Sequence, residues 1–172
     1  MDRSANRKQI ADRFSAEALR FVEWAEGTSD PGPLTAPVAL RQIVAIYAAA
    51  LALPQPWTER VSNHREDIDF SHNLAAVRQR AGAIALQHYS EIFSPLVPQE
   101  EPVVGDLADD LVDIYRDVAA GLELYECGRI DDALWEWGFN FQAHWGEHAS
   151  SAIRALHCYL AQEDPSGLCS DC

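Results

Sequence analysis

The sequence predicts an all-α protein, a compact bundle of about five helices with no sheet. Apolar residues recur at three- and four-residue steps through most of the chain, which is the spacing of one buried helix face. Glycine and proline clusters separate these segments, and no long segment alternates apolar and polar residues as a half-buried strand would. The 172 residues suffice for one domain, which we expect to span 1–165, with a flexible tail at 166–172.

The first two predicted helices precede residue 54. The first ends at Gly27, and its apolar residues at helical spacing are Ile10, Phe14, Ala18, Phe21, Val22 and Ala25. The second begins with Thr35 as N-cap, tolerates Pro37 in its first turn and ends at Pro54. Because its many alanines have little bulk, neighbouring helices could approach it closely, and we expect it to be the central helix.

The remaining chain predicts three more helices. Residues 54–70 form a polar connector, and a third helix covers about 71–93, beyond which Pro95 and Pro98 prevent its continuation. A fourth helix runs over about 106–127. A fifth begins with Asp131 or Asp132 as its cap and continues to about Gln162.

Charge and hydropathy narrow the possible partners. Thirteen basic and 27 acidic residues give a formal net charge of −14, which repels nucleic acid and anionic membranes and favours a cationic partner or none. The most apolar run, 38–53, contains Arg41 and is shorter than the roughly 20 residues of a membrane span. The N-terminus lacks the apolar segment of a secretory signal, so we expect a cytoplasmic protein with four reduced cysteines. An acidic mimic of nucleic acid is a further alternative, suggested by the charge alone.

The fourth helix concentrates carboxylates on one third of its circumference: Asp106, Asp109, Asp110, Asp113 and Asp117. An apolar stripe occupies the opposite side, so we interpret the acids as a solvated face. The alternative is the Asp-Asp-x-x-Asp string that begins at Asp109, because such strings hold Mg²⁺ against diphosphates in helical prenyl-transfer enzymes. Those enzymes need a second acidic motif, and the sequence shows none.

The fifth helix contains His144-Trp-Gly-Glu147-His148, which has the His-x-x-Glu-His order of inverted zinc peptidases. Glu147 projects away from the face of His148, and no downstream ligand follows, so we do not interpret the string as a peptidase site. We expect His148 to be a buried, hydrogen-bonded residue, paired with an aspartate of the fourth helix. His144 lies nearer the edge and is the better candidate to contact a ligand, and Arg154 lies on the polar side. Gly146 favours the close approach of another backbone or a large ring.

Two cysteines, Cys169 and Cys172, form a C-x-x-C pair at the end of the chain. With His157 or Cys158 they could form half of a metal site, but a second C-x-x-C pair is missing. We therefore interpret them as part of an unpaired tail.

Several strings resemble a bacterial family known as domain of unknown function 5063. They include residues 101–117, Gly121-Leu-x-Leu-Tyr125, Ala133-Leu-Trp-Glu-Trp137, His144-Trp-Gly-x-His148, Ala152-Ile-Arg-Ala-Leu-His157 and Tyr89-x-x-x-Phe93. The resemblance begins near Phe21 and implies a helical fold without an assigned activity. The family pattern tolerates other residues at the position of Glu147, which implies that Glu147 is not a general base.

These observations favour a helical binding or interaction module over an enzyme. Aromatic residues on two sides of the fifth helix suggest a groove against the fourth helix, rich in aromatics and histidine, and predict self-association, such as a homodimer, or a protein partner. The candidate binding residues are Trp137, His144, Trp145, His148, Arg154, Asp110, Asp113 and Asp117. We expect no cofactor. The alternative is a metal-dependent hydrolase that combines Asp109, Asp110, Asp113 and Asp117 with His144 and His148, but an acidic face pointing to solvent could not reach a buried His148.

Overall fold

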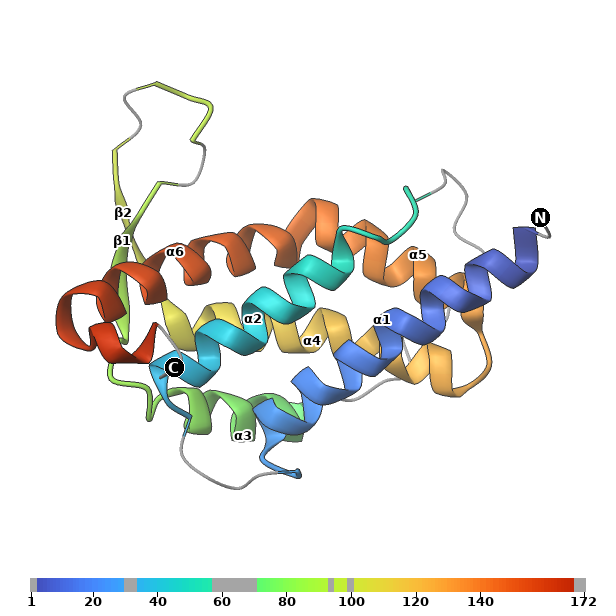
Figure 1. The fold of residues 1–172 in the computed structure, drawn as a ribbon, viewed down its shortest axis with the longest axis horizontal. Helices are drawn as coiled ribbons and strands as arrows, with labels where there is room; N and C mark the ends of the chain where they lie inside the picture. Colours follow the sequence, from blue (N-terminus) through green and yellow to red (C-terminus); the bar gives the residue numbers. More distant parts are fainter. Residues whose placement is uncertain (1–2, 30–33, 57–70, 93–94, 99–100, 169–172) are drawn as a thin grey trace.

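A computed structural model describes residues 3–29, 34–56, 71–92, 95–98 and 101–168. The helical class is confirmed (Figure 1). The main elements are α1 (Arg3–Glu26), α2 (Ala36–Ala50), α3 (Ser71–Ala81), β1 (His88–Glu91), β2 (Val103–Asp106), α4 (Leu107–Glu126), α5 (Ile130–Asn140) and α6 (Gly146–Glu163). A π-helical turn, Phe141–Trp145, joins α5 to α6, and a 3-10 turn, Pro165–Gly167, follows α6.

The central helix is α4, not α2 as its alanine content predicted. It packs against α1, α3, α5 and α6, and it crosses the middle of the fold in Figure 1. By contrast, α2 packs against α1 and α6 and leaves Val44, Ala45 and Ala48 exposed. Alanine permits close packing but does not require it, so a small-residue helix can equally lie at the surface. As a consequence, α4 is buried on nearly every side, including part of its acidic side.

The predicted helix ends hold where local chemistry fixes them. α1 stops at Gly27, whose φ of 77° lies in the left-handed region, and the N–H groups of Gly27 and Thr28 both bond the carbonyl of Glu23. The side chain of Asp106 caps α4 by accepting from the N–H groups of Ala108 and Asp109. Thr35 occupies the N-cap position of α2, although its hydroxyl makes no capping hydrogen bond.

The prediction of no sheet is wrong, and so is the long third helix. α3 ends at Ala81, and β1 pairs with β2 in an antiparallel ladder with His88 opposite Asp106. This hairpin extends away from the helices in Figure 1. Each strand has only four residues, too few for alternation to stand out in the sequence. Through β1 the hairpin places Tyr89 against α4, where its hydroxyl donates to Asp110.

The predicted fifth helix is not one continuous α-helix. The π-helical turn between α5 and α6 inserts an extra residue, which changes which side chains face the core after it. From the last residue of the turn onward, the buried positions are Trp145, Gly146, Ala149, Ala152, Leu156 and Leu160. A single α-helical stripe would have buried His148 in place of Ala149. The insertion instead moves His148 to the edge of the core, towards α4.

Two large aromatics of this region, Trp137 and Trp145, belong to the core. Trp137 and Trp145 are both 0% exposed, and the indole N–H of Trp137 donates to the carbonyl of Val118 at 2.9 Å. Gly121 permits that contact, since a Cβ there would lie 2.2 Å from Trp137 Nε1. Phe139, which stacks on Trp135, is 42% exposed. Trp137 and Trp145 therefore do not line an open aromatic groove between α4 and α5.

Among the described residues, no helix combines the length and apolarity needed to cross a bilayer.

Candidate metal centre

The acidic side of α4 is partly buried. Asp110 is 3% exposed and Asp117 is 1% exposed, whereas Asp109 lies in solvent and pairs with Arg78. The prediction of a solvated face is therefore wrong for Asp110 and Asp117. That prediction assumed that α4 has a single buried stripe. In the structure, α6 and the π-helical turn also cover the acidic side of α4. Carboxylates buried this deeply need hydrogen-bonding partners.

Two histidines supply those partners. Asp117 Oδ2 lies 2.6 Å from His144 Nδ1, and Asp110 Oδ1 lies 2.9 Å from His148 Nδ1. The predicted pairing of His148 with an aspartate of this helix is thus confirmed, although His148 is half-buried and not enclosed in the core. Each carboxylate fixes the orientation of its imidazole and occupies Nδ1, which leaves Nε2 as the remaining ring nitrogen.

The two histidines converge on Asp113. Their ring centroids are 4.9 Å apart, and His148 Nε2 lies 3.6 Å from Asp113 Oδ2. One ligand atom from each of these three residues can be chosen so that all lie within 4.8 Å of one another. The side chains of Asp113, His144 and His148 keep exposed fractions of 23%, 36% and 30%, so small molecules can reach them. This arrangement can hold a metal ion, and we refer to the three residues as the triad.

Tyr89 and Arg116 complete the hydrogen bonding around the triad. The hydroxyl of Tyr89 donates to Asp110 Oδ2 at 2.6 Å, on the oxygen that His148 does not use. Arg116 Nη2 lies 2.9 Å from Asp113 Oδ1, and its Nε lies 3.7 Å from Asp117 Oδ1. Arg116 therefore holds one oxygen of Asp113 and leaves the other directed at His148.

Burial and hydrogen bonding shift the pKa values of this group. Burial raises the pKa of Asp110, while the hydrogen bonds from His148 and Tyr89 oppose that shift. The hydrogen bond with Asp110 raises the pKa of His148 against the effect of burial. Burial, followed by the bond to Asp110, raises the pKa of Tyr89 well above its usual range. Tyr89 thus remains a protonated donor at neutral pH.

The other candidates from the sequence lie elsewhere. Trp137 and Trp145 are core residues, and Arg154 lies farther along α6, exposed. Glu147 is exposed and is not among the residues that could hold the ion, in agreement with its predicted orientation away from His148. Cys169 and Cys172 fall outside the described residues.

Sequence reasoning missed Tyr89 and Arg116. Tyr89 lies in the segment predicted to be the third helix. Only its place in the Tyr89-x-x-x-Phe93 string indicates that it could contribute to a site. In the sequence, Arg116 offers only a local partner for the acids of the same helix. Its position between Asp113 and Asp117 could not be predicted without knowing that α4 is buried on this side.

The family of the chain follows from its match to known sequences. Residues 7–162 match the family described as Domain of unknown function (DUF5063). The chain belongs to that family. Its fold is also similar to that of a solved structure, the crystal structure of protein BF1032 from Bacteroides fragilis, a structural genomics target. The two chains are 20% identical with a TM-score of 0.67, and the similarity covers 89% of this chain and 92% of that one. No curated protein matches this DUF5063 chain.

Proposed function

We propose that this protein is a metal-dependent hydrolase whose divalent cation is held by Asp113, His144 and His148. The observation that carries the proposal is the convergence of the triad, with each histidine oriented by its own buried aspartate. Histidine ligands in metal sites nearly always donate their second ring nitrogen to a carboxylate, a carbonyl or water. Both pairs here have that form, and a solvated acidic helix has no need of it.

The dimensions of the triad suit a transition metal. Ligand atoms bound tetrahedrally to Zn²⁺ at about 2.0–2.1 Å lie about 3.3 Å apart. The separation of His148 Nε2 from Asp113 Oδ2, 3.6 Å, is already close to that value, and the full set lies within 4.8 Å. Small side-chain rotations would close the rest. Two imidazoles with one carboxylate favour Zn²⁺, Fe²⁺ or Mn²⁺ over Mg²⁺, which prefers oxygen ligands alone.

Three protein ligands leave a coordination position free for water. Structural zinc sites are usually closed by four protein ligands, whereas catalytic sites have three and keep an open position. A bound cation lowers the pKa of its water towards neutrality and so generates a nucleophile. The partial exposure of all three ligands would admit a substrate to that position. Hydrolysis is therefore the reaction type that this site supports best.

The interaction module expected from the aromatic residues has less support. Two of the aromatics proposed for its groove, Trp137 and Trp145, are 0% exposed and fill the core. The histidines proposed beside them face carboxylates of α4 instead of an apolar surface.

The direct test is a metal titration of untagged protein. We expect one equivalent of Zn²⁺ or Mn²⁺ to bind per chain and to raise the unfolding temperature, because an ion that binds only the native state stabilises it. Elemental analysis of the purified protein and calorimetric titration after chelation measure this. A chain that carries no metal as purified and is neither bound nor stabilised by Zn²⁺, Mn²⁺ or Fe²⁺ would rule out the proposal.

Replacing Asp117 by asparagine tests the support of His144 separately. Asparagine keeps the shape of the side chain but removes the negative charge of Asp117. That charge lies 2.6 Å from His144 Nδ1, orients the imidazole and makes His144 a stronger ligand. We expect metal affinity to fall about 10- to 100-fold. The matched control is Asp109→Asn, on the same helix but exposed and paired with Arg78, which should keep its affinity within about twofold. Equal affinities for the two variants would show that Asp117 does not act through the metal site.

A further inference from the structure

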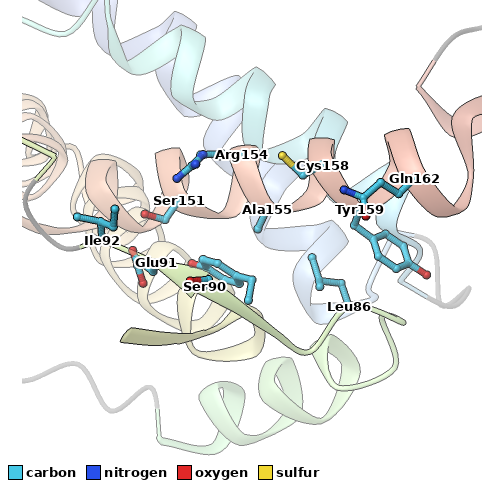
Figure 2. Close-up of a pocket in the computed structure, with 11 residues that line it drawn as sticks. Leu86, Ser90, Glu91, Ile92, Ser151, Arg154, Ala155, Cys158, Tyr159 and Gln162 are labelled. Atoms are coloured by element: carbon cyan, nitrogen blue, oxygen red, sulfur yellow. The ribbon is translucent and has the colours of Figure 1, made fainter. Parts of the chain in front are cut away.

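A groove lies beside the triad, between β1 and the part of α6 from Ser151 to Gln162. It has a volume of about 420 Å³, within the range of about 300–1,000 Å³ that is usual for small-molecule sites. Figure 2 shows the strand crossing α6, with side chains from both elements around the groove. Its lining includes Ser90, Glu91, Ser151, Arg154, Cys158 and Tyr159.

The groove shares a wall with the metal centre. Tyr89 lines it and also donates to Asp110, the partner of His148. Ser151 lines it from α6, three residues after His148, and residues at that spacing are neighbours on a helix surface. The carboxylate of Glu91 is near enough to contribute to the raised pKa of both Asp110 and His148. A molecule in the groove would therefore lie next to the triad.

The groove contains one basic side chain, Arg154. It is exposed and makes no ion pair with any residue that the structure describes, although the chain has a formal net charge of −14. Most basic side chains among the described residues form an ion pair with a carboxylate, as Arg7, Arg78 and Arg129 do. In Figure 2 the guanidinium of Arg154 extends back along α6 towards Ser151, the end nearer the triad. Guanidinium binds carboxylate and phosphate groups in a bidentate manner.

We propose that this groove is the substrate subsite of the metal centre, and that Arg154 binds an oxyanion, a carboxylate or a phosphate group, of a small substrate. The inference rests on the proposed function, since it gives that hydrolase its substrate class. With the oxyanion on Arg154, Ser151 and Tyr89 lie along the path to the triad, and Leu86 and Tyr159 offer apolar contacts to the rest of the molecule. The negative charge of Glu91 disfavours substrates with anionic groups at both ends.

Cys158 reports directly on occupation of the groove. It is an exposed free cysteine in the lining, whereas Cys127, also exposed and free, lies at the end of α4 outside the lining. We expect phenylphosphonate or benzoate to slow alkylation of Cys158 and to leave Cys127 unaffected, as measured by mass spectrometry of the peptides. The two probes distinguish the sources of the oxyanion. Protection by phenylphosphonate alone assigns a phosphate, and protection by benzoate alone assigns a carboxylate.

Arg154→Gln should raise the probe concentration needed for protection at least about tenfold, because a charge-assisted bidentate contact is lost. The matched control is Arg41→Gln, on exposed α2 and outside the lining, which should behave as the parent protein. Arg154→Lys keeps the charge and should recover part of the protection. Circular dichroism verifies that all three variants are folded.

The outcomes separate this inference from the proposed function. No protection of Cys158 by either probe, or equal protection in the parent and in Arg154→Gln, overturns the subsite even where the metal titration succeeds. If the chain binds no metal but protection of Cys158 still depends on Arg154, the oxyanion site is supported and the proposed hydrolase function is ruled out. Zn²⁺ affinity should be the same in Arg154→Gln as in the parent, since Arg154 is not a ligand.

Discussion

Replacing His148 by alanine should weaken zinc binding by at least about 100-fold. Zinc sites with four protein ligands bind with about 10–16 kcal/mol, so one ligand contributes several kcal/mol, and each 1.4 kcal/mol is about tenfold in affinity. His148 Nε2, which lies 3.6 Å from Asp113 Oδ2, would face the ion, while Asp110 holds the opposite side of the ring through Nδ1. His144→Ala should give a loss of the same order, because His144 occupies the equivalent place beside Asp117. Calorimetric titration of the metal-free proteins measures both losses.

The control for this experiment lies on the same helix. His157 is exposed and is not one of the residues that could hold the ion, so His157→Ala should bind zinc as the parent does. Unfolding of the metal-free variants is recorded in parallel, because His148→Ala removes one hydrogen-bonding partner of the buried Asp110 and leaves it the hydroxyl of Tyr89. We expect that loss to cost about 1–3 kcal/mol of stability. Zinc affinity that is unchanged in folded His148→Ala, or reduced equally in His157→Ala, would contradict the assignment of the ligands.

The sequence was sufficient for the helices whose ends are fixed by local chemistry. Gly27 terminates α1 because its left-handed φ suits glycine, and Asp106 begins α4 because its carboxylate caps two N–H groups. These signals depend on a few neighbouring residues and therefore do not depend on how the helices pack against one another. The two short strands carry no comparable signal. Their pairing depends on contacts between residues on either side of the connecting segment, and the sequence of that segment does not indicate a hairpin.

The site itself was half predictable. The type of partner for His148, an aspartate of the fourth helix, followed from the cost of leaving an imidazole unpaired near the core. The convergence of Asp113, His144 and His148 did not follow, because it depends on two long-range facts. One is that α4 lies at the centre of the fold, so its acids face α6 instead of water. The other is the π-helical turn, which a regular angular projection of the fifth helix cannot represent.

The turn has a direct effect on the site. Single π turns inside α-helices are rare and occur frequently at functional sites. Here His144 lies within the turn and His148 follows it in α6, so the turn determines how the two imidazoles face Asp117 and Asp110. In a π turn the carbonyl of one residue faces the N–H five residues later, which relates Phe141 to Gly146. The turn therefore depends on a glycine at position 146, where a Cβ would lie too close to the carbonyl oxygen of Phe141.

Gly146→Ala should destabilise the protein by about 3 kcal/mol, the upper part of the range for overpacking a core. A Cβ at position 146 would lie 2.2 Å from the carbonyl oxygen of Phe141 and 3.0 Å from its Cδ2. The first of these is a backbone atom, so rotation of a side chain cannot relieve the contact, and the turn itself must shift. We expect the unfolding temperature to fall by about 6–12 °C, at about 2–4 °C per kcal/mol for a domain of this size. Because the shift separates His144 from His148, zinc affinity should fall as well.

Gly82→Ala is the matched control, since Gly82 is exposed and its nearest neighbour to an added Cβ is a backbone oxygen at an ordinary 3.4 Å. That variant should unfold within about 1 kcal/mol of the parent and bind zinc equally well. The comparison separates the general effect of replacing a glycine from the requirement of the turn. If Gly146→Ala kept both its unfolding temperature and its zinc affinity, the turn could accept a side chain, and the geometry of the triad would not depend on Gly146. A loss of zinc affinity larger than the loss of stability explains would instead show that the turn positions His144 for the metal.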